Sequence, residues 1–199
     1  MAKISIENID IDYSELSVAQ IYNKIISAVA PTGNILAVGD SARDHAILNM
    51  QYFRDNRESI RAIGINIVPS HCGPFNHFEI KYCNAHDIEY PDGYFDSVLS
   101  FMMLEHDPEF WLSVSEMKRV LKKGGSFIIG VPGFMNSIKI SSDKFHLGNG
   151  TICYENHGDP DCYRFSPHAL EYFIFKGMDK VKFFSSKLPP RLIGTGYKI

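Results

Sequence analysis

Residues 84–132 read NAHDIEYPDGYFDSVLSFMMLEHDPEFWLSVSEMKRVLKKGGSFIIGVP, and this stretch decides the fold. The apolar run over residues 96–101 predicts a buried strand. Asp107 followed by Pro108 is a typical helix start, because the carboxylate can cap the first turn and proline fits its first position. Residues 126–131 predict a second strand after that helix. The order strand, helix, strand favours parallel strands joined by a crossover helix.

The same alternation extends in both directions along the chain. Apolar runs predict further strands over residues 34–38, 60–66, 77–83, 180–186 and 194–199, and helical spacing predicts helices over residues 17–29, 42–54 and 166–177. We therefore expect an α/β fold, a doubly wound, Rossmann-like three-layer sandwich. Its sheet has seven strands, is mostly parallel and ends in an antiparallel C-terminal edge hairpin. Residues 1–199 are expected to form a single domain. Residues 133–162 lack a predicted element and are expected to form a lid or substrate-binding insert.

Composition and spacing exclude several classes of function. A net charge of -3 argues against a nucleic-acid partner. No apolar run approaches the roughly 20 residues that span a bilayer, and the first residues lack an apolar signal core, so we expect a cytoplasmic protein. The spacing of Cys153, His157, Cys162 and His168 matches no strong zinc pattern, and no metal site is expected.

Two short motifs carry a family resemblance. Leu104, Glu105 and His106, followed by an acidic loop and a helix, resemble the type 11 group of class I S-adenosylmethionine-dependent methyltransferases. The resemblance covers roughly residues 34–167. Residues 161–167, DCYRFSP, are similar to a segment of methyltransferases that modify polysaccharides and sugars. The resemblance implies an enzyme that transfers a methyl group from S-adenosylmethionine to a small molecule, such as a sugar or another hydroxyl or carboxyl acceptor.

The resemblance also implies roles for particular residues. His106 is the candidate catalytic base, because imidazole can accept a proton from a hydroxyl near neutral pH. The acceptor is expected to meet the side chains of Tyr163, Arg164 and His146. The expected cofactor-binding residues follow the ends of the predicted strands: Gly39, Asp40, Ser41, Arg43, Asn66, Ile67, Asn84, Ala85, His86, Phe101 and Met102.

The cofactor segments depart from the family pattern. Ser41 and Arg43 stand where the family usually has glycines, while Asn66 and Asn84 stand where it has acids. Asp40 is expected to compensate by pairing with the cofactor's ammonium group, with Ser41 or Arg43 meeting its carboxylate.

These departures also permit an alternative, a catalytically inactive methyltransferase-like binding or partner subunit. The edge hairpin and the insert are the candidate surfaces for a homodimer. The sequence argues against a nicotinamide-dependent dehydrogenase, because its G-x-G-x-x-G motif would need glycine at position 41, which is serine, and at position 44, which is aspartate.

Overall fold

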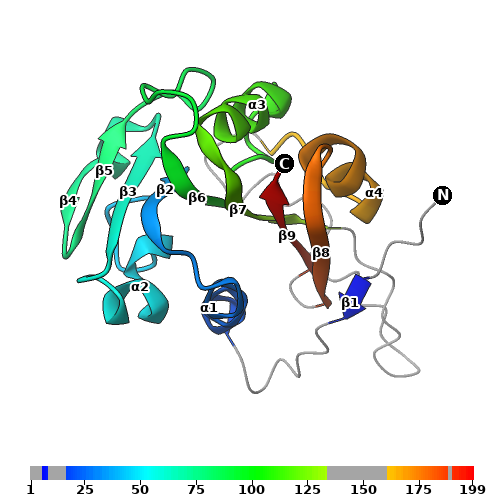
Figure 1. Ribbon diagram of the computed structural model, residues 1–199, viewed down its shortest axis with the longest axis horizontal. Helices are drawn as coiled ribbons and strands as arrows, with labels where there is room; N and C mark the ends of the chain where they lie inside the picture. The colour runs from blue at the N-terminus through cyan, green and yellow to red at the C-terminus, as the bar shows by residue number, and fades with distance from the viewer. Residues whose placement is uncertain (1–5, 9–16, 134–160, 188–189) are drawn as a thin grey trace, which may run out of the picture.

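The computed structural model describes residues 6–8, 17–133, 161–187 and 190–199, which form one sheet of nine strands (Figure 1). The strands are β1 (Ile6–Asn8), β2 (Gly33–Val38), β3 (Ile60–Asn66), β4 (Gly73–Phe75), β5 (Phe78–Tyr82), β6 (Phe95–Phe101), β7 (Leu121–Pro132), β8 (Met178–Lys187) and β9 (Pro190–Lys198). The helices are α1 (Val18–Val29), α2 (Gln51–Asp55), α3 (Phe110–Val120) and α4 (Pro167–Ala169). Short 3-10 turns form η1 (Ile47–Asn49) and η2 (Pro69–His71), and a π-helical turn forms η3 (Leu170–Ile174).

All seven predicted strands are present, and the doubly wound α/β architecture is confirmed. The predicted strand number is wrong, because β1 and β4 extend the sheet at its two edges. Each of them has only three residues, which is too short for an alternating apolar pattern to reveal. β4 also contains Pro74, which lacks an N–H donor and is tolerated at a sheet edge.

The hairpin of β8 and β9 is antiparallel as predicted, but it does not form the edge of the sheet. β9 is inserted between β7 and β8 and pairs antiparallel with both, while β1 pairs in parallel with the outer side of β8. The strands β7, β6, β2, β3 and β5 are mutually parallel. The chain leaves β2 toward β3 on one side and returns to β6 on the other. This reversal of strand order marks the place where open α/β sheets bind ligands.

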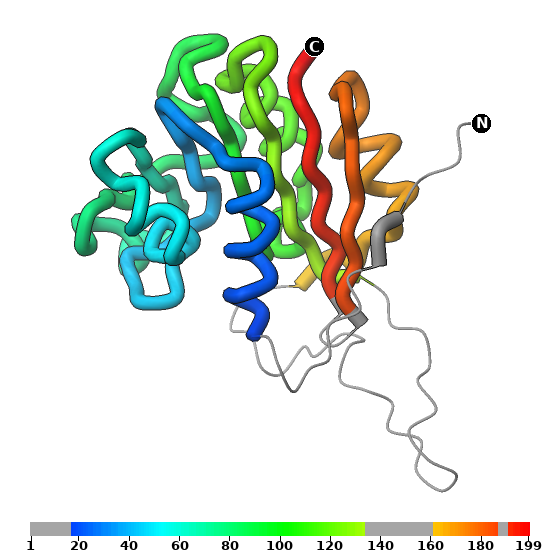
Figure 2. Tube along the Cα trace, turned by 60° about the horizontal axis from the view of Figure 1, so that its bottom comes forward, coloured from blue at the N-terminus to red at the C-terminus, as the bar shows by residue number. Residues whose placement is uncertain are grey.

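Each face of the sheet has its own apolar core, because alternate residues of a strand point to opposite faces. Leu36 of β2 packs in a cluster that includes Met117 of α3. Its neighbour Ile35 packs in a second cluster that includes Ile26 of α1. Figure 2 shows α1 lying across one face of the sheet. The described residues therefore form the three layers that the sequence predicted.

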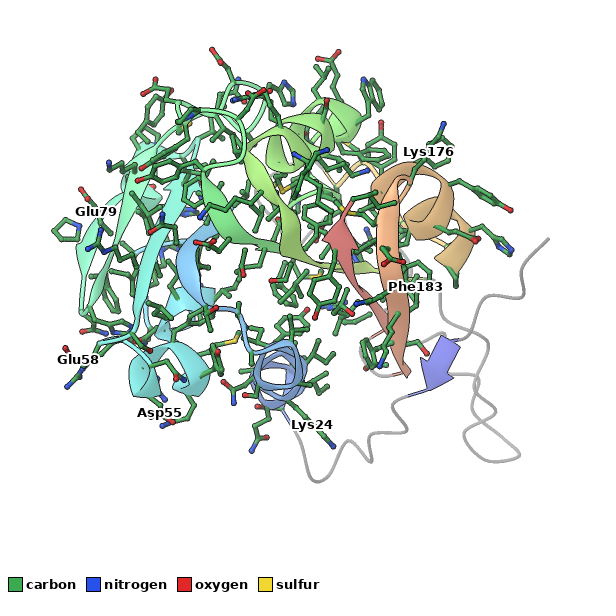
Figure 3. All side chains as sticks on the ribbon, viewed as in Figure 1. Lys24, Asp55, Glu58, Glu79, Lys176 and Phe183 are labelled. Carbon is green, nitrogen blue, oxygen red and sulfur yellow. The ribbon has the colours of Figure 1, made fainter. Side chains whose placement is uncertain are left out.

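The first helix begins where the sequence predicts, because Ser17 caps it. Ser17 Oγ accepts from the backbone N–H of Gln20 (3.3 Å), and Gln20 Oε1 accepts from the backbone N–H of Ser17 (2.6 Å). Charged side chains such as Lys24, Asp55 and Glu58 project outward at the periphery (Figure 3). Among the described residues, no helix is both long enough and apolar enough to span a bilayer.

The predicted continuous helix over residues 42–54 is wrong. The segment instead contains turns, the 3-10 turn η1 and the short helix α2. Its apolar positions are nevertheless buried as the helical spacing suggested, including Ala46 and Phe53. The side chain that breaks the helix is Asp40, whose contacts belong to the candidate site.

Candidate functional site

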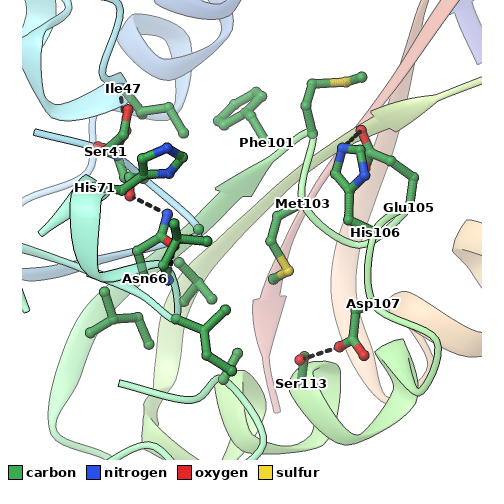
Figure 4. A pocket seen from close by; sticks show the side chains of 18 of the residues that line it. Ser41, Ile47, Asn66, His71, Phe101, Met103, Glu105, His106, Asp107 and Ser113 are labelled. Atoms are coloured by element: carbon green, nitrogen blue, oxygen red, sulfur yellow. Dashed lines mark hydrogen bonds and ion pairs between the residues drawn. The ribbon is translucent and has the colours of Figure 1, made fainter. Parts of the chain in front are cut away.

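A cleft of about 940 Å³ opens where β2, β3 and β6 end, at the point where the strand order reverses. The loops after β2, β3, β5 and β6 form its walls. Figure 4 shows Ser41, His71 and Asn66 on one side, facing Met103 and Glu105 on the other. These segments are distant in the sequence, and they meet because parallel strands end at one edge of a sheet.

Gly39 shapes the first wall of the cleft. It follows β2 with φ +78°, a left-handed conformation that favours glycine. A Cβ atom at this position would overlap the side chain of Met103, which comes from the opposite wall. The backbone N–H of Gly39 donates to the carbonyl of Ile65 (2.9 Å) and fixes the loop to β3. The one glycine retained in this loop is therefore the one that the packing requires.

The carboxylate of Asp40 is bound by its own loop. It accepts hydrogen bonds from the backbone N–H groups of Ser41 and Ile47 (both 2.9 Å) and Leu48 (3.0 Å). Burial raises the pKa of Asp40 above its ordinary value, and the three amide donors oppose that rise. Because the amides at positions 47 and 48 bind Asp40, they are not available for a regular helix. A cofactor ammonium group would share Asp40 with these three donors.

Asn66 ties the loops after β2 and β3 together. Its Nδ2 donates to the backbone carbonyl of Asp40 and its Oδ1 accepts from the backbone N–H of Val68, both at 2.8 Å (Figure 4). A second bond joins the same loops, from the N–H of Ala42 to the carbonyl of His71 (2.9 Å). An aspartate at position 66 could not donate to a carbonyl. The replacement of the family's acid by an amide therefore has a structural reason.

The loop after β5 is fixed to the start of α3 by a histidine–carboxylate contact. His86 Nε2 lies 3.0 Å from both carboxylate oxygens of Asp107. Asp107 also accepts from the N–H of Glu109 (2.9 Å) and from Ser113 Oγ (2.5 Å). Asn84 Oδ1 accepts from the N–H of His86 (3.0 Å). This network holds the wall of the cleft that carries Asn84 and Ala85.

The loop after β6 brings the Leu-Glu-His motif into the cleft. Phe101, the last residue of β6, packs its ring against Tyr22 of α1 with ring centroids 4.4 Å apart. Met102 adopts φ +55°, and its N–H donates to the carbonyl of Gly130 (2.8 Å). This turn directs the following residues, Met103 and Glu105, along the cleft wall.

Glu105 is the most unusual polar group of the cleft. Its side chain is 2% exposed, and Oε1 lies 3.8 Å from His106 Nε2. Its Oε2 has no hydrogen-bond partner among the described residues. Burial raises the pKa of Glu105 to about 7, and the neighbouring charge of Asp161 adds to the rise, while His106 and Arg191 oppose it. A buried carboxyl with one unused oxygen is a group that a ligand could complete.

Glu105 also makes stability depend on pH. Its pKa is about 7 in the folded protein against an ordinary value of 4.5, so between these pH values the folded state binds a proton that the unfolded state has lost. Stability therefore falls as pH rises through this window, by on the order of 3 kcal/mol. We expect Glu105→Gln to raise the urea midpoint of unfolding at pH 8 and to leave it nearly unchanged at pH 4.5. Equal midpoints of variant and wild type at pH 8 would contradict this account.

The structure brings most of the predicted site residues together. All eleven expected cofactor residues line the cleft, together with His106 and Arg164. Arg164 is held by a bidentate ion pair with Asp161, with N–O distances of 2.5 and 2.7 Å. Tyr163 is absent from the lining, because its hydroxyl donates to the carbonyl of Pro108 (2.6 Å). His146 lies outside the described residues. The roles of all these residues remain predictions.

Sequence reasoning missed several lining residues. Tyr22 and Arg191 come from α1 and β9, and no motif marks them. Burial raises the pKa of Tyr22 to about 12, and the Arg191 guanidinium beside it opposes that rise. Glu105 was visible inside the Leu-Glu-His motif, but only the burial of its side chain distinguishes it from an ordinary loop carboxylate. Within the described part of the chain, no three His, Cys, Asp or Glu side chains are arranged to hold a metal ion.

Comparison with known proteins identifies the domain. Residues 46–129 match the family model described as a methyltransferase domain. An S-adenosylmethionine-dependent methyltransferase from Archaeoglobus fulgidus has a similar fold, with 16% identity, a TM-score of 0.61, and coverage of 92% of this chain and 95% of that chain. Phosphoethanolamine N-methyltransferase 2 from Haemonchus contortus, solved with S-adenosylmethionine, shows 14% identity and a TM-score of 0.63 over 88% of this chain. The match spans 52% of the Haemonchus chain, so this chain corresponds to about half of that protein.

Residues 46–129 thus match a methyltransferase domain, and the described residues share the fold of solved S-adenosylmethionine-dependent methyltransferases. S-adenosylmethionine is the cofactor named for both of these solved proteins. The fold alone does not define the reaction, because the [4+2]-cyclase SpnF shares it with a TM-score of 0.60 at 15% identity, over 90% of this chain and 80% of that chain.

The cleft has the features that such a cofactor requires. Its volume lies within the range of small-molecule sites, and Ser41 and Arg43 leave it open, since Ser41 is half-buried and Arg43 is exposed at the rim. Gly39 has no side chain, and the Met103 side chain packs against it from the opposite wall. The loop that departs from the family pattern therefore leaves the cleft open to a ligand of this size.

Proposed function

We propose that this chain transfers a methyl group from S-adenosylmethionine to a hydroxyl group of a small molecule, with sugars as the leading acceptor class. The observation that carries the proposal is one cleft in which the loops after β2, β3 and β5 face the Glu105–His106 pair. The loops after β2, β3 and β5 supply backbone and side-chain amide groups that hold the nucleoside and the amino-acid part of S-adenosylmethionine. The pair supplies acid–base groups on the opposite wall.

In this proposal one wall of the cleft binds the cofactor. Gly39, Ser41 and Asn66 border the side on which the cofactor is held, and the His86–Asp107 contact keeps the loop after β5 in place. S-adenosylmethionine supplies a methyl group on a cationic sulfur when it is bound. The protein's main contribution is then alignment of donor and acceptor, which can account for several orders of magnitude in rate.

His106 is the proposed base for a hydroxyl acceptor. Its imidazole lies in the cleft, and the Glu105 carboxyl at 3.8 Å stabilises the imidazolium that forms when it takes the hydroxyl proton. Arg164, whose charge is balanced by Asp161, offers further donors to an acceptor rich in hydroxyls. A carboxylate acceptor would need no base, so the presence of this pair favours a hydroxyl.

Calorimetry and label transfer test the proposal in sequence. Wild-type protein is titrated with S-adenosylmethionine and with S-adenosylhomocysteine, and micromolar binding of either ligand is the expected result. Protein is then incubated with methyl-labelled S-adenosylmethionine and glucose, glucuronate or catechol as acceptor probes. Label in a hydroxyl compound that falls at least about a hundredfold in His106→Asn supports the proposal. No binding of either ligand at millimolar concentration contradicts it for this chain.

A further inference from the structure

We propose that Glu105 senses the charge of the bound cofactor. In this proposal part of the Glu105 population is protonated in the empty cleft at neutral pH, and it releases that proton to solvent when a cationic sulfonium enters. The cleft then binds S-adenosylmethionine in preference to S-adenosylhomocysteine, which has lost that charge. The inference rests on the proposed function, since it requires that both compounds bind in this cleft.

Glu105 lies in the wall of the cleft that faces the loop after β2. Glu105 follows Met103 by two residues, and Met103 packs against Gly39 across the cleft. Figure 4 shows the Glu105 side chain next to His106, on the wall of the cleft opposite Ser41 and Asn66. At 2% exposure it is shielded from water, so a charge in the cleft acts on it with little screening.

The Glu105 carboxyl is only partly satisfied by its neighbours. Its Oε1 is near His106, but Oε2 has no partner among the described residues although it is fully buried. An ionised carboxylate in this state lacks compensation, whereas a protonated carboxyl tolerates it better. A positive charge that arrives in the cleft supplies the missing compensation and shifts the balance toward the carboxylate.

The surrounding charges leave the neutral and the ionised form of Glu105 close in free energy. Four elements face Glu105: α1 with Tyr22, its own loop with His106, the segment before α4 with Asp161 and Arg164, and β9 with Arg191. Asp161 favours the neutral carboxyl, whereas His106 and Arg191 favour the carboxylate. Arg164 is bound to Asp161 through two N–O contacts, so those two charges largely offset each other. One added positive charge can therefore decide the protonation of Glu105.

Proton linkage gives the direction of the effect. Burial places the pKa of Glu105 at about 7, so the empty cleft holds a mixture of both forms at neutral pH. A ligand that favours the carboxylate binds more tightly as pH rises through this range, because it no longer has to displace a proton. We expect the affinity for S-adenosylmethionine to rise about tenfold between pH 5.5 and 8, as for a shift of one pKa unit. The affinity for S-adenosylhomocysteine should stay nearly constant.

Titration calorimetry with the two commercially available ligands tests this directly. Both are measured from pH 5.5 to 8 on wild type, Glu105→Gln, His106→Gln and Glu58→Gln. The last variant makes the same chemical change at an exposed position far from the cleft (Figure 3). Measurements at pH 7 in phosphate and in imidazole buffer, which differ in ionisation enthalpy, count the protons released on binding.

We expect wild type to release protons on binding S-adenosylmethionine and few on binding S-adenosylhomocysteine. Of the three variants, only Glu105→Gln should lose this difference in proton release between the two ligands. Three results overturn the inference. If both ligands bind with a ratio of affinities that does not change with pH, Glu105 does not sense charge and the proposed function stands. If the release persists in Glu105→Gln and disappears in His106→Gln, the titrating group is His106. If neither ligand binds, the proposed function fails and the inference fails with it.

Discussion

Asp40→Ala should destabilise the fold by about 3 kcal/mol, because it leaves two buried backbone N–H groups, those of Ile47 and Leu48, and the half-buried N–H of Ser41 without an acceptor. It should also weaken S-adenosylmethionine binding, since the loop that Asp40 organises is a wall of the cleft. Urea unfolding measures the first effect and calorimetry the second.

A matched control lies in the same loop. Asp44 is exposed, and the hydrogen bond that it accepts from Asn49 uses its backbone carbonyl, which Asp44→Ala retains. We expect this variant to change stability by less than about 0.5 kcal/mol. Equal losses in the two variants would show that the Asp40 carboxylate does not hold the loop.

Gly39→Ala should weaken S-adenosylmethionine binding at least about tenfold and destabilise the protein by roughly 3 kcal/mol. The left-handed backbone accounts for about 1–2 kcal/mol of that loss. The remainder arises because the new methyl group displaces Met103, and overpacking of this kind typically costs 1–3 kcal/mol. Binding suffers because Met103 is part of the opposite wall.

The variant Gly177→Ala distinguishes the cost of the left-handed backbone from the cost of the overlap with Met103. It also has φ +78°, but a Cβ atom there would have no heavy atom within 4 Å. Gly177→Ala should therefore show the backbone term alone, with binding unchanged. If Gly177→Ala and Gly39→Ala lose the same stability and bind S-adenosylmethionine equally well, the contact between Gly39 and Met103 has no role in the cleft.

The elements that sequence could predict are those decided by local chemistry. The strand over residues 60–66 appears with the bounds expected from its apolar run, and Ser17 caps α1 as its side chain suggests. The prediction of a helix over residues 42–54 was wrong, because the carboxylate of Asp40 binds the backbone amides seven and eight residues further along the chain. Helical spacing reports which side chains are buried, and it does not report how the backbone amides are satisfied.

In the candidate site, too, the sequence predicted what depends on local residues and missed what depends on residues distant in the chain. Strand ends could be located from the sequence, so the residues that follow them were found, including Asn66 and Asn84. The chemistry of Glu105 could not be predicted, because it depends on burial and on charges from Asp161 and Arg191, which are distant in sequence. Asn66 illustrates a related limit. In the sequence, asparagine at this position looks like the loss of a cofactor-binding acid. In the structure, its amide donates to the carbonyl of Asp40 and accepts from the N–H of Val68.

The position of β9 has a consequence for how the protein is made. β9 separates β7 from β8, so a nascent chain from which β9 has not yet emerged exposes two unpaired strand edges. Pairing between β7 and β9 closes a long segment of chain, and such non-local pairing is intrinsically slow. Arg191 enters the cleft with the same strand. Synthesis of the sheet's last inner strand thus also delivers the guanidinium that faces Glu105, so a partly folded chain is aggregation-prone and lacks a complete cleft.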